Sequence, residues 1–444
     1  GGYINGMYPS TRRTYTQALS GCTVPIIGHE TGQFQILPDF KEINKYTGIL
    51  RPANLELFKQ RLAQNNLLRQ IEDLHFASGK FAAICYREDI EMALRTPEFG
   101  GFQMLDLQDF PGQGTALVGL LDAFMESKGI IEPFEFSQFC NRVVPLALFD
   151  KYCWNNDEVF LSTIKISNYA EKTVGKQTIK VHLLNDSGDT IAKQQWYTQL
   201  QNGKLNHIGE FEASLKSVKK STNLTLLISI DGTPYQNKYK IWVYPKKNLL
   251  QKQNITTCRK IDKRMFNLLK EGRKVLLLPD SKEIEKISVG GMFTPDYWNF
   301  SMFKSISESL NRTVSPGTLS IFTDPSHPLF SNFPTESHSN WQWWSILKNS
   351  RPIILNNLKD YIPLVQVIDN IERNHKLGLI FEFQVGKGKL LICSCNLDNI
   401  MDKPEGSQLY NSILEYMDSS HFSPHVQISE LELFNLFNSE IKSR

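Results

Sequence analysis

Three features that would indicate common protein classes are absent from this sequence. Its 49 Lys and Arg residues nearly balance 46 Asp and Glu residues, so the net charge of +3 gives no indication of a nucleic-acid-binding protein. No apolar run approaches the ~18 residues that a membrane-spanning helix requires. The N-terminal residues also lack the charged and apolar regions of a signal peptide, which leaves export open. The composition predicts a globular protein with neither nucleic acid nor membrane as a partner.

Paired cysteine motifs are absent as well. Without CxxC spacing or a dense framework, the cysteines indicate neither a zinc site nor a disulfide scaffold. Cys393 and Cys395 alternate along an expected strand, a position more typical of core packing than of redox chemistry. No metal and no cofactor is predicted. The seven cysteines are Cys22, Cys85, Cys140, Cys153, Cys258, Cys393 and Cys395.

The residues that are present predict a multidomain α/β plus β protein. A chain of 444 residues with 41% hydrophobic content can form two to four cores. Residues 1–148 alternate between strand and helix patterns. Residues 149–246 form short alternating β segments separated by Gly, Asn and Asp turns, as in an antiparallel sandwich. Residues 247–444 return to an α/β pattern, with a helix, a Gly turn and a buried parallel strand over 265–280.

The first region is predicted as strand, helix, strand, helix. Strands are expected over 21–30 and 96–110, and a long helical stretch over 55–95, broken only at 78–80. A last helix is expected over 116–129, ending at its Gly. This order implies parallel strands with any chemistry at their C-terminal ends.

Glu30 lies at the end of the first of these strands, before Gly32, where the chain can turn sharply. A carboxylate at the C-terminal end of a barrel strand is held rigidly and is well placed to act as a nucleophile. The spacing alone also fits a strand-end salt bridge or a helix cap. Both interpretations are left open by the residues themselves.

Three motifs in this region resemble those of glycoside hydrolase family 2, the β-galactosidase/β-glucuronidase family. VPIIGHETG (24–32) resembles the seventh strand of that family's TIM (β/α)8 barrel, and GGFQMLDLQDF (100–110) resembles the eighth. GMYPST (6–11) resembles the end of the sixth strand. The resemblance implies that residues 1–148 are the C-terminal part of such a barrel.

The resemblance also implies roles for individual residues. Glu30 would be the nucleophile of a retaining exo-glycosidase that acts on a terminal β-linked sugar, and the Tyr8 hydroxyl would orient it and keep it ionised. An ordinary half-buried tyrosine is the alternative for Tyr8. The implied substrate-contacting residues are His29, Leu105, Asp106, Gln108 and Asp109.

These substrate contacts have alternatives. Leu105 stands where relatives carry a tryptophan, so their sugar specificity does not carry over. Asp106, Gln108 and Asp109 are equally suited to anchor the loop through the DFPGQG segment (109–114), and His29 is equally suited to packing.

The acid/base carboxylate of the family follows an Asn, and no Asn-Glu pair occurs in this chain. The chain is therefore expected to be a fragment that is inactive alone. The N-terminal remainder of the same protein and a second copy are the protein partners considered, and an oligosaccharide or polysaccharide is the expected substrate. Analogy with such hydrolases suggests a periplasmic or secreted location.

The remaining regions resemble domains that accompany this family. Residues 149–246 resemble its immunoglobulin-like sandwiches, and residues 247–444 resemble glutamine-amidotransferase-like, flavodoxin-like domains. The G-x-C-x-G nucleophile elbow is missing, so the last domain is predicted to be non-catalytic. The alternative function is a non-catalytic carbohydrate-binding or assembly module. Tryptophans that could serve it, although core packing is the other interpretation for each, are Trp154, Trp196, Trp242, Trp341, Trp343 and Trp344.

Overall fold

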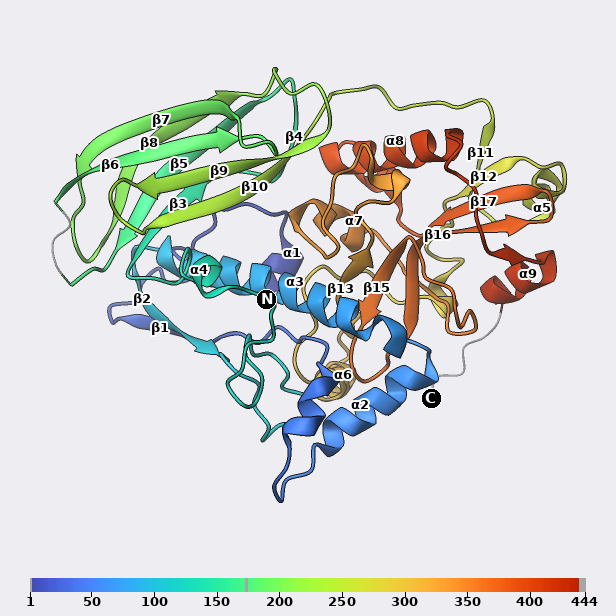
Figure 1. The fold of residues 1–444 in the computed structure, drawn as a ribbon, viewed down its shortest axis with the longest axis horizontal. Helices are drawn as coiled ribbons and strands as arrows, with labels where there is room; N and C mark the ends of the chain where they lie inside the picture. Colours follow the sequence, from blue (N-terminus) through green and yellow to red (C-terminus); the bar gives the residue numbers. More distant parts are fainter. Residues whose placement is uncertain (1, 172–174, 439–444) are drawn as a thin grey trace. The chain divides into compact units, whose positions relative to one another are not determined.

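The computed structural model describes residues 2–171 and 175–438 and has a mixed α/β fold (Figure 1). The described chain divides into two compact units. Unit 1 contains residues 2–34, 82–109 and 118–247, and unit 2 contains residues 35–81, 110–117 and 248–438. The mixed character expected from the sequence is confirmed, and the chain passes between the two units several times along its length.

Unit 1 begins with the short helix α1 (Gly2–Gly6) and contains a two-stranded parallel sheet of β1 (Ile26–Gly32) and β2 (Phe99–Leu105). Both strands and their parallel pairing were predicted. Helix α3 (Ile71–Leu94) connects them, and its residues from Ala82 onward belong to this unit.

The helix predicted over 116–129 is wrong, because this segment is a loop. The Asp122 carboxylate accepts hydrogen bonds from the backbone amides of Phe124 (2.8 Å) and Glu126 (3.0 Å), which closes a turn where a helix would continue. Met125 also has a φ of 64°, outside the helical range. Local side-chain hydrogen bonding therefore overrides the apolar periodicity here.

The break predicted at 78–80 is also wrong, since α3 continues through these residues. Ser78 stays within the helix because its hydroxyl donates to the carbonyl of His75 (3.0 Å) and accepts from the amide of Leu37 (3.0 Å). One Gly inside a long helix costs roughly 1 kcal/mol, which the packing of such a helix can offset.

The rest of unit 1 consists of two sheets of three and five strands, ordered β3-β5-β8 and β4-β10-β9-β6-β7. All pairs are antiparallel except β4 with β10. The elements are α4 (Pro133–Phe136), β3 (Val143–Leu148), β4 (Cys153–Asn155), β5 (Val159–Asn168), β6 (Lys176–Leu184), β7 (Thr190–Gln199), β8 (Lys204–Ser214), β9 (Thr222–Ile230) and β10 (Gln236–Tyr244).

An aromatic core joins the two sheets. Trp154 of β4 meets Phe160 of β5 edge to face, with ring centroids 5.4 Å apart. Trp154 and Trp242 are only 6% and 2% exposed, so the core interpretation holds for both. Trp196 covers Gly209, where an added Cβ would come within 2.5 Å of the indole nitrogen.

Unit 2 is built on a mixed sheet ordered β11-β12-β17-β16-β15-β13. The strands β11, β12 and β17 are parallel, whereas β16 runs antiparallel to β17 and β15. The predicted helix, Gly turn and strand are present as α5 (Lys263–Lys270), Gly272 with a φ of 82°, and β12 (Lys274–Leu277). The other strands are β11 (Ile255–Cys258), β13 (Thr318–Thr323), β14 (Ile353–Ile354), β15 (Val365–Asp369), β16 (Lys376–Val385), β17 (Gly388–Cys393) and β18 (Gln427–Ile428).

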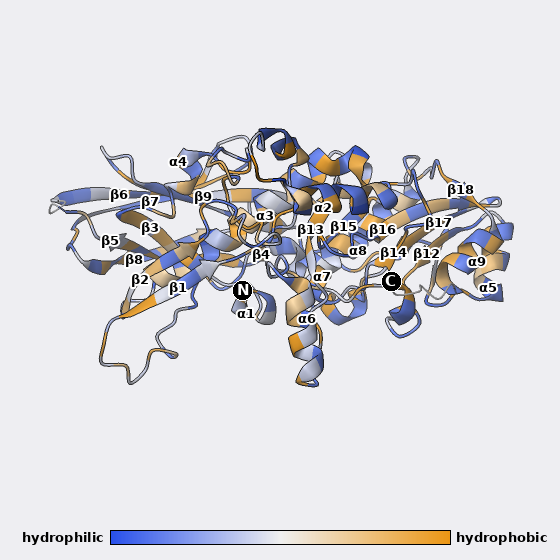
Figure 2. Ribbon diagram, turned by 90° about the horizontal axis from the view of Figure 1, so that it is seen from below, coloured by the Kyte–Doolittle hydropathy of each residue, from blue (hydrophilic) through white to orange (hydrophobic). Residues whose placement is uncertain are grey.

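The helices of unit 2 include a segment distant in sequence. Helix α2 (Ala53–Gln64) buries Leu55, Phe58 and Leu62 in one core with Leu319 of β13 and Ile368 of β15. Residues 35–81 therefore complete the core of the C-terminal α/β region. The remaining helices are α6 (Phe300–Ser309), α7 (Trp344–Lys348), α8 (Pro404–Asp418) and α9 (Glu430–Asn438). Helix α6 carries both hydrophobic and hydrophilic residues (Figure 2).

Two smaller predictions concern buried side chains of unit 2. Cys393 and Cys395 are both fully or nearly fully buried free thiols, as core packing requires. Trp343 is fully buried, and its indole nitrogen donates to the Thr335 hydroxyl at 2.8 Å, so it packs in the core.

Candidate active site

Glu30 occupies an unusual backbone position in β1. Gly28 pairs with Phe102 and Thr31 pairs with Met104, so the ladder is irregular between Gly28 and Thr31, with one extra residue on β1. Glu30 has a φ of 55°, in the left-handed region that residues with side chains rarely adopt. Bulges of this kind re-aim side chains and occur frequently beside active sites. The conformation of Glu30 is therefore a feature that calls for a functional explanation.

The Glu30 carboxylate is held on one side and open on the other. The Gln33 amide nitrogen donates to Oε2 at 3.0 Å, and the Gln33 residue is itself 3% exposed. His29 Nε2 lies 3.6 Å from Oε1, while His29 Nδ1 lies 2.9 Å from Gln103 Oε1 of β2. The Glu30 side chain is 50% exposed. A buried amide thus orients a carboxylate that solvent can still reach.

Tyr86 of α3 fixes the ends of both strands. Its buried hydroxyl donates to the Val118 carbonyl (2.8 Å) and lies 3.2 Å from the Leu105 carbonyl. The same hydroxyl accepts a hydrogen bond from the backbone N–H of Gln33 (3.3 Å). Burial raises the pKa of the Tyr86 phenol, which therefore stays protonated. Gly32, with a φ of 105°, passes so close to this ring that an added Cβ would lie 1.9 Å from Cε1. The turn at Gly32 thus allows close contact with Tyr86.

The end of β2 carries the residues predicted to contact a sugar. Leu105 is 36% exposed, and Asp106 and Gln108 are half-buried. Asp106 Oδ1 accepts from the amide of Leu107 at 2.7 Å. The parallel pairing of β1 and β2 brings this strand end to the same edge as Glu30.

Asp109 has a different environment. Its Oδ1 accepts from the Lys128 ammonium (2.7 Å) and from the amide of Gly119 (2.9 Å), and both charged side chains are 4% exposed. These are the contacts of a loop anchor, which was the alternative interpretation of this residue.

Tyr8 lies in the segment after α1 and is half-buried. Its backbone carbonyl accepts a hydrogen bond from the Arg13 guanidinium. The role of its hydroxyl toward Glu30 stays a prediction.

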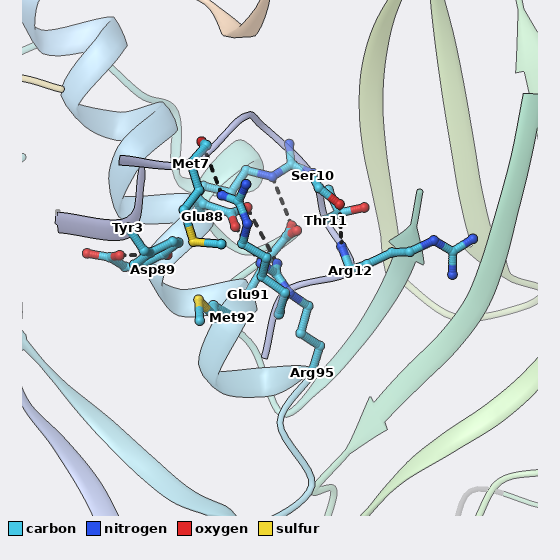
Figure 3. Close-up of polar contacts among 12 residues, drawn as sticks. Tyr3, Met7, Ser10, Thr11, Arg12, Glu88, Asp89, Glu91, Met92 and Arg95 are labelled. Atoms are coloured by element: carbon cyan, nitrogen blue, oxygen red, sulfur yellow. Dashed lines mark hydrogen bonds and ion pairs between the residues drawn. The ribbon is translucent and has the colours of Figure 1, made fainter. Parts of the chain in front are cut away.

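A buried polar cluster on α3 was not anticipated from the sequence (Figure 3). The Tyr3 hydroxyl donates to Asp89 Oδ1 at 2.8 Å, and the Arg95 guanidinium pairs with the Glu88 carboxylate. Burial raises the pKa of both Asp89 and Glu88. Arg95 also donates to the carbonyl of Arg13 at 2.5 Å. The cluster thereby ties the N-terminal segment to α3.

A second set of polar side chains on α3 contacts β10 of the five-stranded sheet. Glu91 accepts from Arg87 (2.9 Å), from the Asn237 amide (3.0 Å) and from the Tyr239 hydroxyl (2.9 Å). The spacing of Arg87, Glu91 and Arg95 at intervals of four residues is the sequence signal that could have indicated this cluster. Because Glu88, Asp89 and Glu91 are all buried and each is paired inside the fold, these residues serve structure rather than catalysis.

Over the described residues, no group of three or more His, Cys, Asp or Glu side chains is arranged to hold a metal ion. None of the helices in the same part of the chain combines the length and hydrophobicity needed to cross a membrane.

Two family models match parts of the chain. Residues 158–245 match a domain of unknown function, DUF8488, and residues 256–438 match another, DUF8487. The search of curated proteins gave no match.

Several solved structures resemble parts of the chain weakly. A putative β-galactosidase from Bacteroides fragilis is 6% identical over 28% of this chain and 23% of its own, with a TM-score of 0.17. The β-glucuronidase of Parabacteroides merdae is 8% identical over 32% of this chain and 22% of its own, with a TM-score of 0.19. A CARDB domain from Pyrococcus furiosus is 9% identical over 23% of this chain and 92% of its own, with a TM-score of 0.19. Weak neighbours thus include glycoside hydrolases, of which the chain spans less than a quarter, and at these TM-scores the likeness carries no argument about activity.

Proposed function

We propose that this chain carries the nucleophile of a retaining glycoside hydrolase that removes a terminal β-linked sugar, with Glu30 as the attacking carboxylate. The observation that carries the proposal is the bulge in β1, which holds Glu30 in a left-handed conformation while Gln33 orients its Oε2. Such local strain persists where the surrounding structure enforces it, and it concentrates at functional sites.

In the proposed reaction, a carboxylate oxygen of Glu30 attacks the anomeric carbon, and the bond from this carbon to the leaving oxygen breaks. A second carboxylic acid, ~5 to 5.5 Å away in retaining enzymes, gives its proton to the leaving oxygen. The same group then removes a proton from the water that releases the sugar from Glu30. His29 and Gln103 would face the bound sugar beside the nucleophile.

The second carboxylic acid is proposed to come from another polypeptide segment. The resemblance associates it with an Asn-Glu pair, and these 444 residues contain none. We therefore expect this chain alone to leave glycosides with poor leaving groups uncleaved. Activated glycosides do not need the acid, because a stabilised phenolate departs without a proton.

The test uses the different acid requirements of activated and unactivated glycosides. The full chain is incubated with 2,4-dinitrophenyl 2-deoxy-2-fluoro glycosides of the common β-linked sugars, and intact mass and peptide mapping follow. Glu30 should carry the covalent sugar, and Glu30→Gln should abolish labelling. Glu212→Gln is the matched control, because Glu212 is an exposed carboxylate of β8 in the same unit.

Labelling of a different carboxylate would contradict the assignment of Glu30. Absence of any adduct in folded protein that still binds glycans would favour the alternative, a non-catalytic carbohydrate-binding or assembly module. The sugar that reacts would at the same time define the specificity.

A further inference from the structure

The small net charge of the chain conceals a segregated surface on the five-stranded sheet. Directly paired residues on neighbouring strands share a face, and alternate residues along a strand point to the same side. The outward side of β6, β7, β9 and β10, which we call the basic face, therefore consists of residues paired with one another in register. Its cationic or titratable side chains are Lys176, Lys180, His182, Lys193, Lys238 and Lys240.

One row crosses all four strands. Lys193 pairs with His182, His182 pairs with Leu227, and Leu227 pairs with Lys238. At ~4.8 Å between neighbouring strands, the two lysines of this row stand ~14 Å apart. Lys180 lies in the next row. The lysines thus spread over the sheet instead of forming one point of charge.

Acidic side chains stand at the ends of these strands. Asp231 pairs with Lys180 at 2.7 Å, at the end of β9. Asp186 and Asp189 belong to the turn between β6 and β7, beyond the ends of both strands. The outward side of the other sheet instead carries the exposed Glu210 and Glu212 of β8. Lys165 of β5 alternates with Thr163 and lies on that same side, so the two faces of the sandwich differ in charge.

Neutral side chains between the lysines add the second part of the pattern. The row of Lys180 contains Gln195, Ser229 and Gln236, whose amides and hydroxyl can hydrogen-bond to hydroxyl groups. Tyr197 of β7 is 69% exposed, with the Lys176 ammonium 5.9 Å from its ring centroid. An aromatic ring that remains this exposed offers a flat surface on which a sugar ring can stack.

We propose that the basic face binds an acidic polysaccharide, a chain of sugars that carry carboxylate or sulfate groups. The spread of lysines fits repeated negative charges, and the Tyr197 ring with its neighbouring amides and hydroxyl fits the sugar rings and their hydroxyl groups. A broad sheet face does not insert into a nucleic-acid groove, which admits a helix or a two-stranded ribbon. This binding goes beyond the chemistry proposed for Glu30 and does not depend on it.

The experiment is calorimetric titration of the full chain with polygalacturonate, which carries carboxylates, and with dextran sulfate, which carries sulfates. Dextran serves as the neutral polysaccharide, and duplex DNA as a polyanion without sugar rings open to stacking. The triple variant Lys180→Gln/Lys193→Gln/Lys238→Gln removes three charges from the basic face. Lys204→Gln/Lys216→Gln/Lys220→Gln removes three exposed charges elsewhere in the unit and controls for net charge.

We expect at least one acidic polysaccharide to bind, more weakly at higher salt. The basic-face triple variant should bind about tenfold more weakly or worse, since several charge contacts are lost together. The control triple variant should bind like the unaltered chain. Tyr197→Ala should weaken polysaccharide binding but not any residual DNA binding. All variants change exposed residues except for the half-buried Lys180, and thermal unfolding checks that they fold.

Equal losses in the two triple variants would overturn the proposal, because binding would then reflect net charge alone. Failure of both acidic polysaccharides to bind would also overturn it. DNA binding as tight as polysaccharide binding, unaffected by Tyr197→Ala, would assign the face to nucleic acid instead. None of these results bears on labelling at Glu30, so the two proposals fail separately.

Discussion

The Lys128 ammonium lies 2.7 Å from Asp109 Oδ1, and both side chains are 4% exposed. The pair joins the end of β2 to the loop over 116–129, and the same oxygen also accepts from the amide of Gly119 at 2.9 Å. It is therefore a buried ion pair with an additional hydrogen bond. Removing one partner from such a pair leaves the other charge buried without compensation.

Asp109→Ala should accordingly lower the free energy of unfolding by about 3 to 5 kcal/mol. Asp106→Ala, at a more accessible carboxylate three residues earlier, should change it by less than about 0.5 kcal/mol. Urea unfolding followed by circular dichroism measures both. Similar small effects at the two positions would mean that Asp109 is available for a ligand rather than committed to the loop.

The close approach of Gly32 to Tyr86 gives a second prediction. Both Gly32 and Gly21 have positive φ angles, but an added Cβ at Gly21 would meet nothing within 4 Å. Gly21→Ala should cost only the roughly 1 to 2 kcal/mol of the left-handed conformation. Gly32→Ala should cost about 1 to 3 kcal/mol more, because the Tyr86 ring must move.

The displaced ring would also disturb the strand end that carries Glu30, so covalent labelling should be slowed by Gly32→Ala and not by Gly21→Ala. Thermal unfolding and the labelling rate are measured on the same samples. Equal stability and equal labelling rates of the two variants would show that the Tyr86 ring can move without affecting the fold or Glu30.

A buried carboxylate of unit 2 should affect the dependence of stability on pH. Asp296 is 2% exposed, and its Oδ2 has no hydrogen-bond partner among the described residues. Burial raises the pKa of Asp296 to about 7. The folded state therefore binds this proton more tightly than the unfolded state, so the contribution of Asp296 to stability declines as the pH rises from about 4 to 7.

Asp296→Asn should remove that decline. The gain in stability over the unaltered chain should be small near pH 4, grow through pH 7 and then level off, at no more than on the order of 4 kcal/mol. Urea unfolding of both proteins over this pH range gives the difference directly. A constant difference at every pH would mean that Asp296 titrates alike in the folded and unfolded states.

The N-terminal segment offers a fourth prediction. Tyr3→Phe removes the hydroxyl that donates to Asp89 at 2.8 Å, while the ring stays in place. Loss of one partner of a buried carboxylate should cost about 1 to 3 kcal/mol. Amide hydrogen exchange should become faster over residues 2–13. The exchange of β9 amides should become faster only as far as the lower free energy of global unfolding requires. Unchanged exchange near the N-terminus would indicate that other contacts hold this segment.

Local features of the fold were predictable from the sequence, and long-range ones were not. The apolar run before Glu30 and the Gly-rich start of β2 specify two strands, and the helix between them makes these strands parallel. Helix α2 shows only an apolar face, and nothing in its own residues indicates that Leu319 and Ile368 cover that face. The loop at 116–129 had a helical periodicity, which the Asp122 turn overrides.

For the candidate site, too, local features were predictable from the sequence and long-range contacts were not. A strand end identifies Glu30, and the orienting amide of Gln33 is close enough in sequence to have been considered. Asp109 and Asp106 look alike in sequence, yet only Asp109 is enclosed with Lys128, because that depends on how the loop folds back. The basic face could not be predicted, because it depends on how four strands pair in register. The composition shows only the small net charge.

The division of the chain also bears on how the protein is made on the ribosome. Residues 35–81 belong to unit 2, so the apolar side chains of α2 emerge long before Leu319 and Ile368, which cover them. At about 5 to 20 residues per second, the delay is on the order of tens of seconds. During that time unit 1 can complete its sandwich, whereas α2 waits with an uncovered hydrophobic surface. Nascent chains halted between residues 250 and 310 should therefore be the species that most needs a chaperone.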